Sequence, residues 1–102
     1  MTIYRLVFEE RARTEWEKLD KAVRERFKKK LKERLVNPRV PSARLRDLPN
    51  CYKIKLRSPG YRLVYQVLDD RLVVLVVAIG KREQEEAYAK AVAALARLHD
   101  RS

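Results

Sequence analysis

The stretch that decides the fold reads Cys51-Tyr-Lys-Ile-Lys-Leu-Arg-Ser-Pro-Gly-Tyr-Arg-Leu-Val-Tyr-Gln66. Two runs of alternating residue types flank a Ser-Pro-Gly break, and this pattern is typical of a β-hairpin. Successive side chains on a strand point to opposite faces of the sheet. Lys53, Lys55 and Arg57 therefore share one face of the first strand, and Arg62 lies on one face of the second.

The length of the hairpin loop decides which of these cations face each other. If Pro59 and Gly60 are the central residues of a two-residue turn, Arg57 pairs with Arg62, whereas a four-residue loop pairs Lys55 with Arg62. Either even-length loop gathers the four cations Lys53, Lys55, Arg57 and Arg62 on one face, and a three-residue loop would break this alignment. Like charges that face each other destabilise a sheet, so this face is expected to bind an anion.

The composition indicates one small globular domain with a strong positive charge. Of the 102 residues, 46% are hydrophobic and 38% are charged, and the formal net charge is +11. A chain of this length can bury one core, so we expect a single domain over residues 1–102. The charge favours polyanionic partners, namely nucleic acid, the ribosome or an anionic membrane. The lone Cys51 excludes an internal disulfide and is typical of a reducing cytosol.

One strand and two helices are predicted before the hairpin. Residues Ile3 to Phe8 are rich in β-branched and aromatic side chains, which favour a strand. Glu9 and Glu10 then open a helix, because negative charge suits a helix N-terminus. A second helix follows Asp20 and ends near Asn37. From helical spacing, the buried residues are Ala12, Trp16 and Leu19 in the first helix and Val23, Phe27, Leu31 and Leu35 in the second.

The exposed face of the second helix is strongly basic. It carries a one-sided excess of cations that only Glu25 and Glu33 oppose. A charge run of this kind is usually no more than a solvated helix surface. The excess here predicts contacts to RNA phosphates that position the molecule without reading sequence. The cations that we expect to bind RNA or the ribosome are Lys28, Lys29, Lys30 and Lys32.

A buried strand and a last helix are predicted after the hairpin. Residues 38–50 contain three prolines and are expected to form a loop. A turn at Asp69-Asp70 leads to the apolar run Leu72–Ile79, which is typical of a strand covered on both faces. Gly80 ends this strand. A helix is then predicted to begin at Lys81, with one buried face formed by Tyr88, Val92 and Leu95.

The order of elements is therefore β-α-α-β-β-β-α, which predicts an α+β fold with helices packed on a mainly antiparallel sheet. A two-residue turn at Asp69-Asp70 would pair Arg62 with Val77. This register places the end of the last strand beside the tip of the hairpin. Arg82, which follows soon after, is then expected near Arg62.

Familiar catalytic groups are mostly missing. The only histidine, His99, lies among the last few residues, and no cluster of His, Cys, Asp or Glu has metal-ligand spacing. With glycine only at positions 60 and 80, the sequence has no phosphate-binding glycine loop. What remains is a set of cations with tyrosines nearby: Lys53, Lys55, Arg57, Arg62, Lys81 and Arg82.

Such a set can cleave RNA without a metal or any other cofactor. A 2′-hydroxyl must lose a proton, the pentavalent phosphate must be stabilised, and the 5′-oxygen must leave. Neighbouring cations lower the pKa of a lysine towards the range of a general base. Arginines offer bidentate donors to the phosphate, and a tyrosine can stack on a base. The same residues would also suit a passive RNA-binding face.

Three motifs of the chain match those of a known bacterial family. They are Cys51-Tyr-Lys-Ile-Lys-Leu-Arg-Ser58, Gly60-Tyr-Arg-Leu-Val-Tyr-Gln-Val67, and Gly80-Lys-Arg-Glu83 followed by Tyr88. These residues resemble the RelE toxins, and the similarity continues upstream through Trp16 and Lys28-Lys-Lys-Leu31 and covers nearly the whole chain to about Leu95. The resemblance implies a single RelE/ParE-like toxin domain. It also implies a ribosome-dependent endoribonuclease that cuts mRNA in the A site by metal-independent 2′-hydroxyl attack.

The resemblance implies catalytic roles for five residues. Lys55 is expected to act as the general base, with Lys53 as charge support. Arg62 is expected to stabilise the phosphate, and Arg82 to stabilise the phosphate and the leaving group. Tyr88 is expected to stack on a base of the mRNA, and its alternative is a place in the core.

The resemblance also implies partners. An acidic RelB-type antitoxin would cover the basic surface of a monomeric toxin and assemble with it into a hetero-oligomer. The other expected partners are the ribosome and mRNA, with Arg57 and Lys81 as supporting contacts. Because Arg5 and Glu9 interrupt the apolar start and no run approaches the length of a membrane span, we expect no signal peptide, no membrane partner and a cytoplasmic location.

Two other functions stay open at this point. A ParE-like relative on the same architecture would inhibit DNA gyrase and cleave no RNA, although the five active-site residues argue against it. A non-catalytic RNA-binding or ribosome-binding protein would bind in a salt-sensitive way and leave the message intact.

Overall fold

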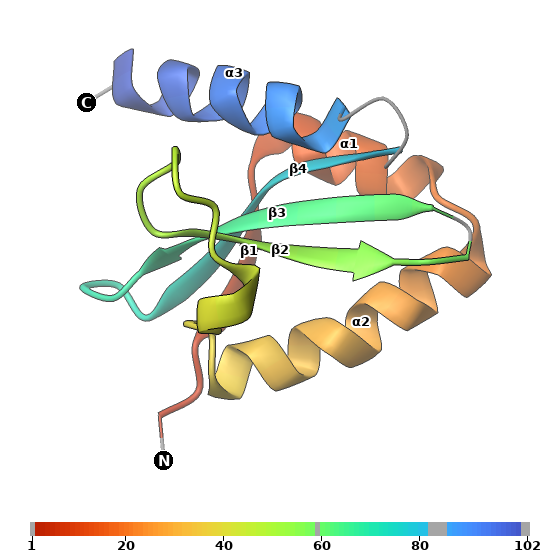
Figure 1. The fold of residues 1–102 in the computed structure, drawn as a ribbon, viewed down its shortest axis with the longest axis horizontal. Helices are drawn as coiled ribbons and strands as arrows, with labels where there is room; N and C mark the ends of the chain where they lie inside the picture. The colour runs from red at the N-terminus through yellow and green to blue at the C-terminus, as the bar shows by residue number, and fades with distance from the viewer. Residues whose placement is uncertain (1, 59, 82–85, 101–102) are drawn as a thin grey trace.

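The computed structural model describes residues 2–58, 60–81 and 86–100 (Figure 1). Its elements follow in the predicted order, with one short 3-10 helix, η1, added in the loop before the hairpin. They are β1 (Arg5–Phe8), α1 (Glu10–Lys18), α2 (Lys21–Val36), η1 (Pro41–Ala43), β2 (Cys51–Leu56), β3 (Tyr61–Leu68), β4 (Val73–Lys81) and α3 (Glu86–Asp100). Within these described ranges, no helix has both the length and the apolar character needed to cross a bilayer.

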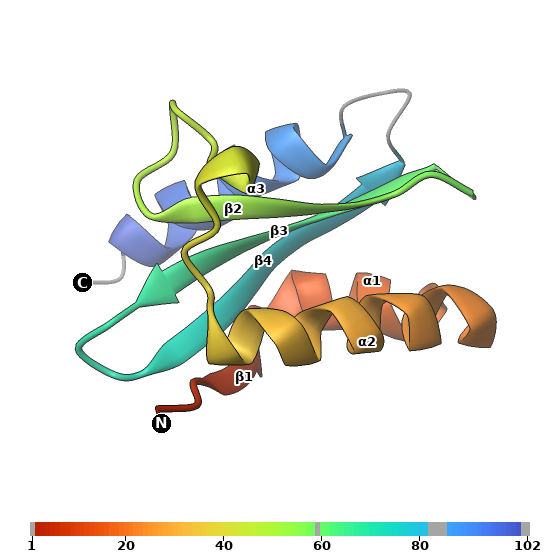
Figure 2. The same ribbon diagram turned by 60° about the horizontal axis from the view of Figure 1, so that its bottom comes forward.

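The four strands form one sheet in the order β1-β4-β3-β2, in which only β1 and β4 run parallel. Figure 2 shows α1 and α2 against one face of this sheet and α3 against the other. The arrangement confirms the α+β fold with helices packed on a mainly antiparallel sheet. The hairpin strand β2 is the last strand in this order, and Arg44 bridges its outer side at Tyr52.

The core under the first two helices follows the predicted helical spacing. Val23, Phe27 and Leu31 of α2 are at most 4% exposed and pack against β2 and β3. The ring of Trp16 in α1 lies between two other rings, with centroids 5.1 Å from Phe8 and 6.2 Å from Phe27. Burial of this apolar stripe stabilises α2, whose opposite face is almost wholly charged.

The core under α3 differs from the prediction. The helix buries three alanines against the sheet, Ala87, Ala91 and Ala94, each at most 1% exposed. Of the face predicted to be buried, Val92 is 44% exposed, and Tyr88 and Leu95 are only partly buried. Alanine has no side chain beyond Cβ, so the helix lies close to the sheet. The predicted helix start is also wrong, because Lys81 still pairs with β3 and α3 begins at Glu86.

The register between β3 and β4 also differs from the prediction. Arg62 pairs with Gly80 and not with Val77. The turn spans residues 69–72, because Leu72 takes a left-handed conformation with φ of 54° and the strand begins only at Val73. A bulge at Val77 then shifts the alternation of β4 by one residue, which turns Gly80 towards α3.

The first strand is shorter than the predicted run from Ile3. It pairs with β4 from Arg5, which lies opposite Val73, to Phe8. Tyr4 instead donates its backbone N–H to the carbonyl of Leu35 at 2.9 Å. This bond connects the residue before β1 to the last turn of α2.

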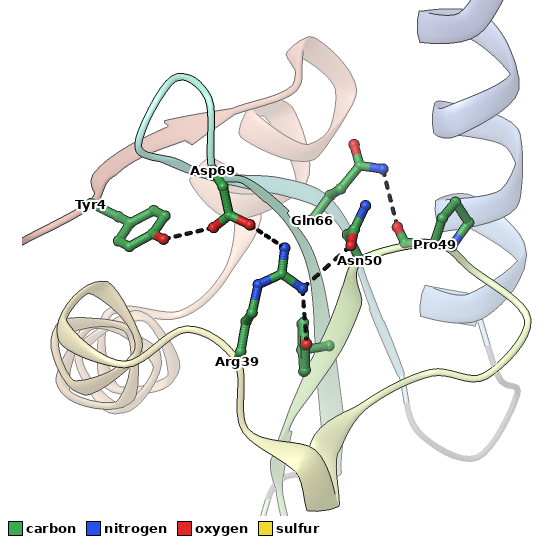
Figure 3. Close-up of polar contacts among 7 residues, drawn as sticks. Tyr4, Arg39, Pro49, Asn50, Gln66 and Asp69 are labelled. Carbon is green, nitrogen blue, oxygen red and sulfur yellow. Dashed lines mark hydrogen bonds and ion pairs between the residues drawn. The ribbon is translucent and has the colours of Figure 1, made fainter.

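Arg39 connects three segments at the end of the sheet away from the β2–β3 loop (Figure 3). Its guanidinium donates to Asp69 Oδ2 in the β3–β4 turn at 2.5 Å, and to Asn50 Oδ1 and Tyr52 Oη at 3.3 Å each. The hydroxyl of Tyr4 donates to the other oxygen of Asp69 at 2.6 Å. The bond from Tyr4, followed by the bond from Arg39, lowers the pKa of Asp69. These contacts fix the start of β2, and hence the strand that carries the predicted site.

Candidate active site

Lys55 and Arg62 face each other across β2 and β3. Leu56 pairs with Tyr61, so the hairpin has the four-residue loop, which is one of the two lengths that the sequence left open. Lys53 lies two residues earlier on the same strand face, opposite Val64. The three cations therefore share a face, and it is the face on which α3 packs, because Val64 belongs to the core under that helix.

Among these three cations, Arg62 has a buried N–H donor that is available to a ligand. Its side chain is half-buried, and within the described residues its buried Nε has no hydrogen-bond partner. A buried donor without an acceptor costs about 1–3 kcal/mol. An oxygen of a bound phosphate would satisfy it, and the planar guanidinium matches phosphate geometry.

Gly80 places the first turn of α3 beside Arg62. It pairs with Arg62 in the ladder, and a Cβ atom there would lie 2.5 Å from the Cβ of Glu86 and 2.7 Å from the backbone nitrogen of Ala87. Only glycine allows this approach of helix and strand. The sequence indicated Gly80 as the end of a strand, and no local signal showed that α3 begins directly above it.

Tyr88 lies in that first turn, partly within the core, which was the alternative to its predicted role in stacking on a base. Its ring is half-buried and packs against the core under α3. Its hydroxyl donates to Asp47 Oδ2 at 3.3 Å, in the loop before β2. The structure thus adds Asp47 to the site. No sequence pattern pointed to this residue, because the contact joins positions 41 residues apart.

The remaining cations predicted for this end of the sheet lie in different places. Arg57 follows β2 directly and lies in the hairpin loop. Lys81 is exposed and pairs with Tyr61, whose ring packs on the core under the first two helices, so Lys81 lies on the opposite face from Arg62. Arg82 lies outside the described residues.

The predicted basic face of α2 lies on the opposite side of the sheet from α3. The four lysines Lys28, Lys29, Lys30 and Lys32 are exposed, and α2 buries its apolar side against the first core. Lys28 forms an ion pair with Glu25 at 3.6 Å. Lys30 lines a hollow that also contains Lys55, so the two basic regions meet round the edge of β2.

Cys51 takes no part in this chemistry. Its side chain is fully buried under α3, and burial raises the pKa of the thiol to about 12. A thiol held protonated in an apolar site is a poor nucleophile. Cys51 therefore acts as a small hydrophobic residue at the start of β2.

The arrangement can bind a phosphodiester and stabilise added negative charge on it. Lys53, Lys55 and Arg62 lie on one face of the hairpin, and Tyr88 lies in the first turn of α3, which packs on the same face of the sheet. Preorganised cations of this kind stabilise a transition state in which charge develops on phosphate oxygens.

Toxins of toxin-antitoxin systems resemble this chain in sequence. The family model described as ParE toxin of type II toxin-antitoxin system, parDE, matches residues 6–86. The mRNA interferase toxin RelE of Escherichia coli K12 is 58% identical over 89 residues, which cover 87% of this chain and 94% of that protein.

Solved structures agree with the sequence comparison. A mutant of the E. coli toxin RelE in the free state matches with a TM-score of 0.83 and 56% identity over 89% of this chain and 96% of its own. The toxin in the intact E. coli RelBE toxin-antitoxin complex matches with a TM-score of 0.75 and 59% identity over 76% of this chain and 95% of its own. The chain therefore belongs to this family of type II toxins, among its RelE members, as the motifs of its hairpin and last strand had indicated.

Proposed function

We propose that this chain is the toxin of a type II toxin-antitoxin system and acts as an endoribonuclease that cuts mRNA in the ribosomal A site. The observation that carries the proposal is the pairing of Lys55 with Arg62, whose buried Nε lacks an acceptor among the described residues. The name of its E. coli relative, an mRNA interferase, supports the same activity.

In the proposed reaction Lys55 takes the proton of the 2′-hydroxyl, and the freed oxygen attacks the adjacent phosphorus. The bond from phosphorus to the 5′-oxygen breaks, and that oxygen takes up a proton from solvent. The products are a 2′,3′-cyclic phosphate and a 5′-hydroxyl. No metal is assigned a role, because the side chains supply the base and the positive charge.

Four further residues complete the proposed site. We assign Arg62 to the phosphate oxygens and Lys53 to general charge support. Arg82 follows β4 in the chain, and its proposed role at the phosphate and the leaving group rests on the family resemblance. Tyr88 is assigned to the base next to the cut, because aromatic stacking would fix the in-line geometry.

Primer extension on translated messages tests the proposal. The intact protein should cut within the A-site codon, and Arg62→Ala should abolish the cut. Arg71→Ala is a matched control, because it removes the same charge from the turn between β3 and β4. Messages that stay intact with the unmodified protein would overturn the assignment.

The family model keeps one alternative open, because its description names ParE. A protein of that kind would inhibit gyrase and leave RNA intact. A DNA supercoiling assay separates the two functions, and we expect supercoiling to proceed normally in the presence of this protein.

The proposal includes an acidic RelB-type antitoxin as the partner. The E. coli relative occurs in a complex with its antitoxin RelB, and the net charge of +11 on this chain suits an acidic segment. We propose that the toxin is a monomer in the cytoplasm, a single folded unit over residues 1–102, until it assembles with this antitoxin. Growth arrest on expression, relieved by a co-expressed acidic protein encoded beside it, is the expected result.

A further inference from the structure

A hollow of about 540 Å³ lies between α2 and the end of β2, beside the proposed active site. Two side chains come from α2, where Arg26 and Lys30 are one helical turn apart and share a side of the helix. The rest come from the hairpin. Among the residues that the structure describes, the lining is Arg26, Lys30, Lys55, Leu56, Arg57 and Ser58.

The charge that the described residues bring to this hollow is of one sign. Four of these lining residues are cations and none of them is a carboxylate. Among the ion pairs formed within residues 2–58, 60–81 and 86–100, none includes Arg26, Lys30 or Arg57. Lys28 on the same helix, in contrast, is paired with Glu25. Uncompensated cations in a concave site focus their field and attract an anion.

Arg26 also fixes the shape of the hollow. Its guanidinium donates to the carbonyl oxygen of Ser58, which connects α2 to the hairpin loop. Arg57 precedes Ser58 in that loop, so the same bond fixes the backbone that carries Arg57. A guanidinium has five N–H donors, and this bond uses only one of them. The others can face a ligand.

Lys55 connects the hollow to the proposed active site. It lines the hollow, and it also faces Arg62 across the hairpin. If one phosphate of an RNA strand lies at Arg62, a neighbouring phosphate of the same strand can therefore reach the hollow. An acidic protein segment would also meet positive charge here, but the continuity with the site of the scissile phosphate favours a phosphodiester chain.

We propose that this hollow is a second phosphate site, which binds an RNA backbone beyond the scissile phosphate through Arg26, Lys30 and Arg57. The inference rests on the proposed function, since Lys55 and Arg62 locate the scissile phosphate. The phosphodiester can come from the substrate strand or from ribosomal RNA. Both sources present the same chemistry to the hollow.

The test compares two charge-matched double variants of the full chain. Arg26→Ala/Lys30→Ala removes two cations from the hollow, whereas Lys21→Ala/Arg71→Ala removes two exposed cations that do not line it. Binding is measured to a 2′-O-methyl RNA, which cannot be cut by 2′-hydroxyl attack, and separately to ribosomes, over a range of salt concentrations. Loss of one phosphate contact should weaken binding and flatten the slope of log affinity against log salt by about 0.7.

Each result assigns the site or overturns it. A flatter slope for the oligonucleotide places the substrate strand in the hollow, and a flatter slope for ribosomes alone places ribosomal RNA there. Slopes equal to those of the control with both probes overturn the proposal. Binding of a polyglutamate peptide is measured as well. If Arg26→Ala/Lys30→Ala weakens only this binding, the proposal is overturned in favour of a protein-docking surface.

Two controls keep this result separate from folding and from the proposed function. Lys30→Ala alone leaves the bond from Arg26 to Ser58 in place, so a flatter slope in this variant cannot come from a displaced loop. The uncleavable RNA reports binding whether or not the protein cuts messages. If the hollow variants bind normally while the intact protein still cuts, only the second phosphate site is wrong.

Discussion

Gly80 lies so close beneath α3 that a Cβ atom on it would come within 2.5 Å of the Cβ of Glu86. Because Gly80 also pairs with Arg62, this contact sets the distance between the first turn of α3 and the cationic face of the sheet. Gly80→Ala should therefore displace the start of α3. We expect a loss of about 1–3 kcal/mol in the free energy of unfolding, measured by urea denaturation, as for other overpacked sites. RNA cleavage should fall further than stability alone explains, because Tyr88 lies in the same turn. An unchanged urea midpoint would show that α3 can shift without strain.

The two lysines of β2 should respond differently to a change that keeps their charge. Lys55→Arg retains a cation opposite Arg62 but removes the group assigned as general base. Arginine cannot take up a proton in this range, so single-turnover cleavage should fall by about a hundredfold or more. Lys53→Arg is the matched control and should stay within about tenfold of the unmodified protein. A larger loss for Lys53→Arg than for Lys55→Arg would reverse the two assignments.

Substitutions at Tyr88 separate stacking from hydrogen bonding. Tyr88→Phe keeps the ring and removes the hydroxyl, which donates to Asp47 at 3.3 Å. Tyr88→Ala also removes the ring, and loss of one stacked base costs about 1–3 kcal/mol. We expect Tyr88→Ala to cut far more slowly than Tyr88→Phe in the ribosomal assay, and Asp47→Ala to resemble Tyr88→Phe. Equal losses for Phe and Ala would assign the role to the hydroxyl instead of the ring.

The part of the site that alternation alone could predict is the hairpin. A period of two is a local property, so Lys53, Lys55 and Arg62 could be placed on one face from the sequence. The loop length could not be predicted, since Pro59 and Gly60 suit two loops equally well. The register of β4 depends on the left-handed backbone at Leu72 and the bulge at Val77, and neither has a sequence signal of its own.

The buried face of α3 shows a second limit of sequence patterns. Helical spacing favoured the large side chains Tyr88, Val92 and Leu95, whereas the helix buries small ones. Its close approach to the sheet at Gly80 leaves room only for residues such as Ala87 and Ala91. The hydrophobicity pattern of the sequence carries no information on the distance between α3 and the sheet. The hollow at Arg26 was missed for the same reason, because it joins α2 to a loop 32 residues away.

The acid stability of the fold should depend on Asp69, whose carboxylate accepts bonds from Tyr4 and Arg39 (Figure 3). These bonds lower its pKa from the ordinary 3.8. A carboxylate whose pKa is lowered by folding adds stability at pH values above its unfolded pKa, and this contribution is lost as the pH falls through the folded pKa. Asp69→Asn should therefore lower the urea midpoint at pH 7, and the difference from the unmodified protein should shrink below about pH 3.8. Asp70→Asn is the matched control, because Asp70 lies in the same turn and forms no hydrogen bond or ion pair within the described residues. A difference that stays constant down to low pH would show that the amide disturbs the contacts of Arg39 by its shape and not by its missing charge.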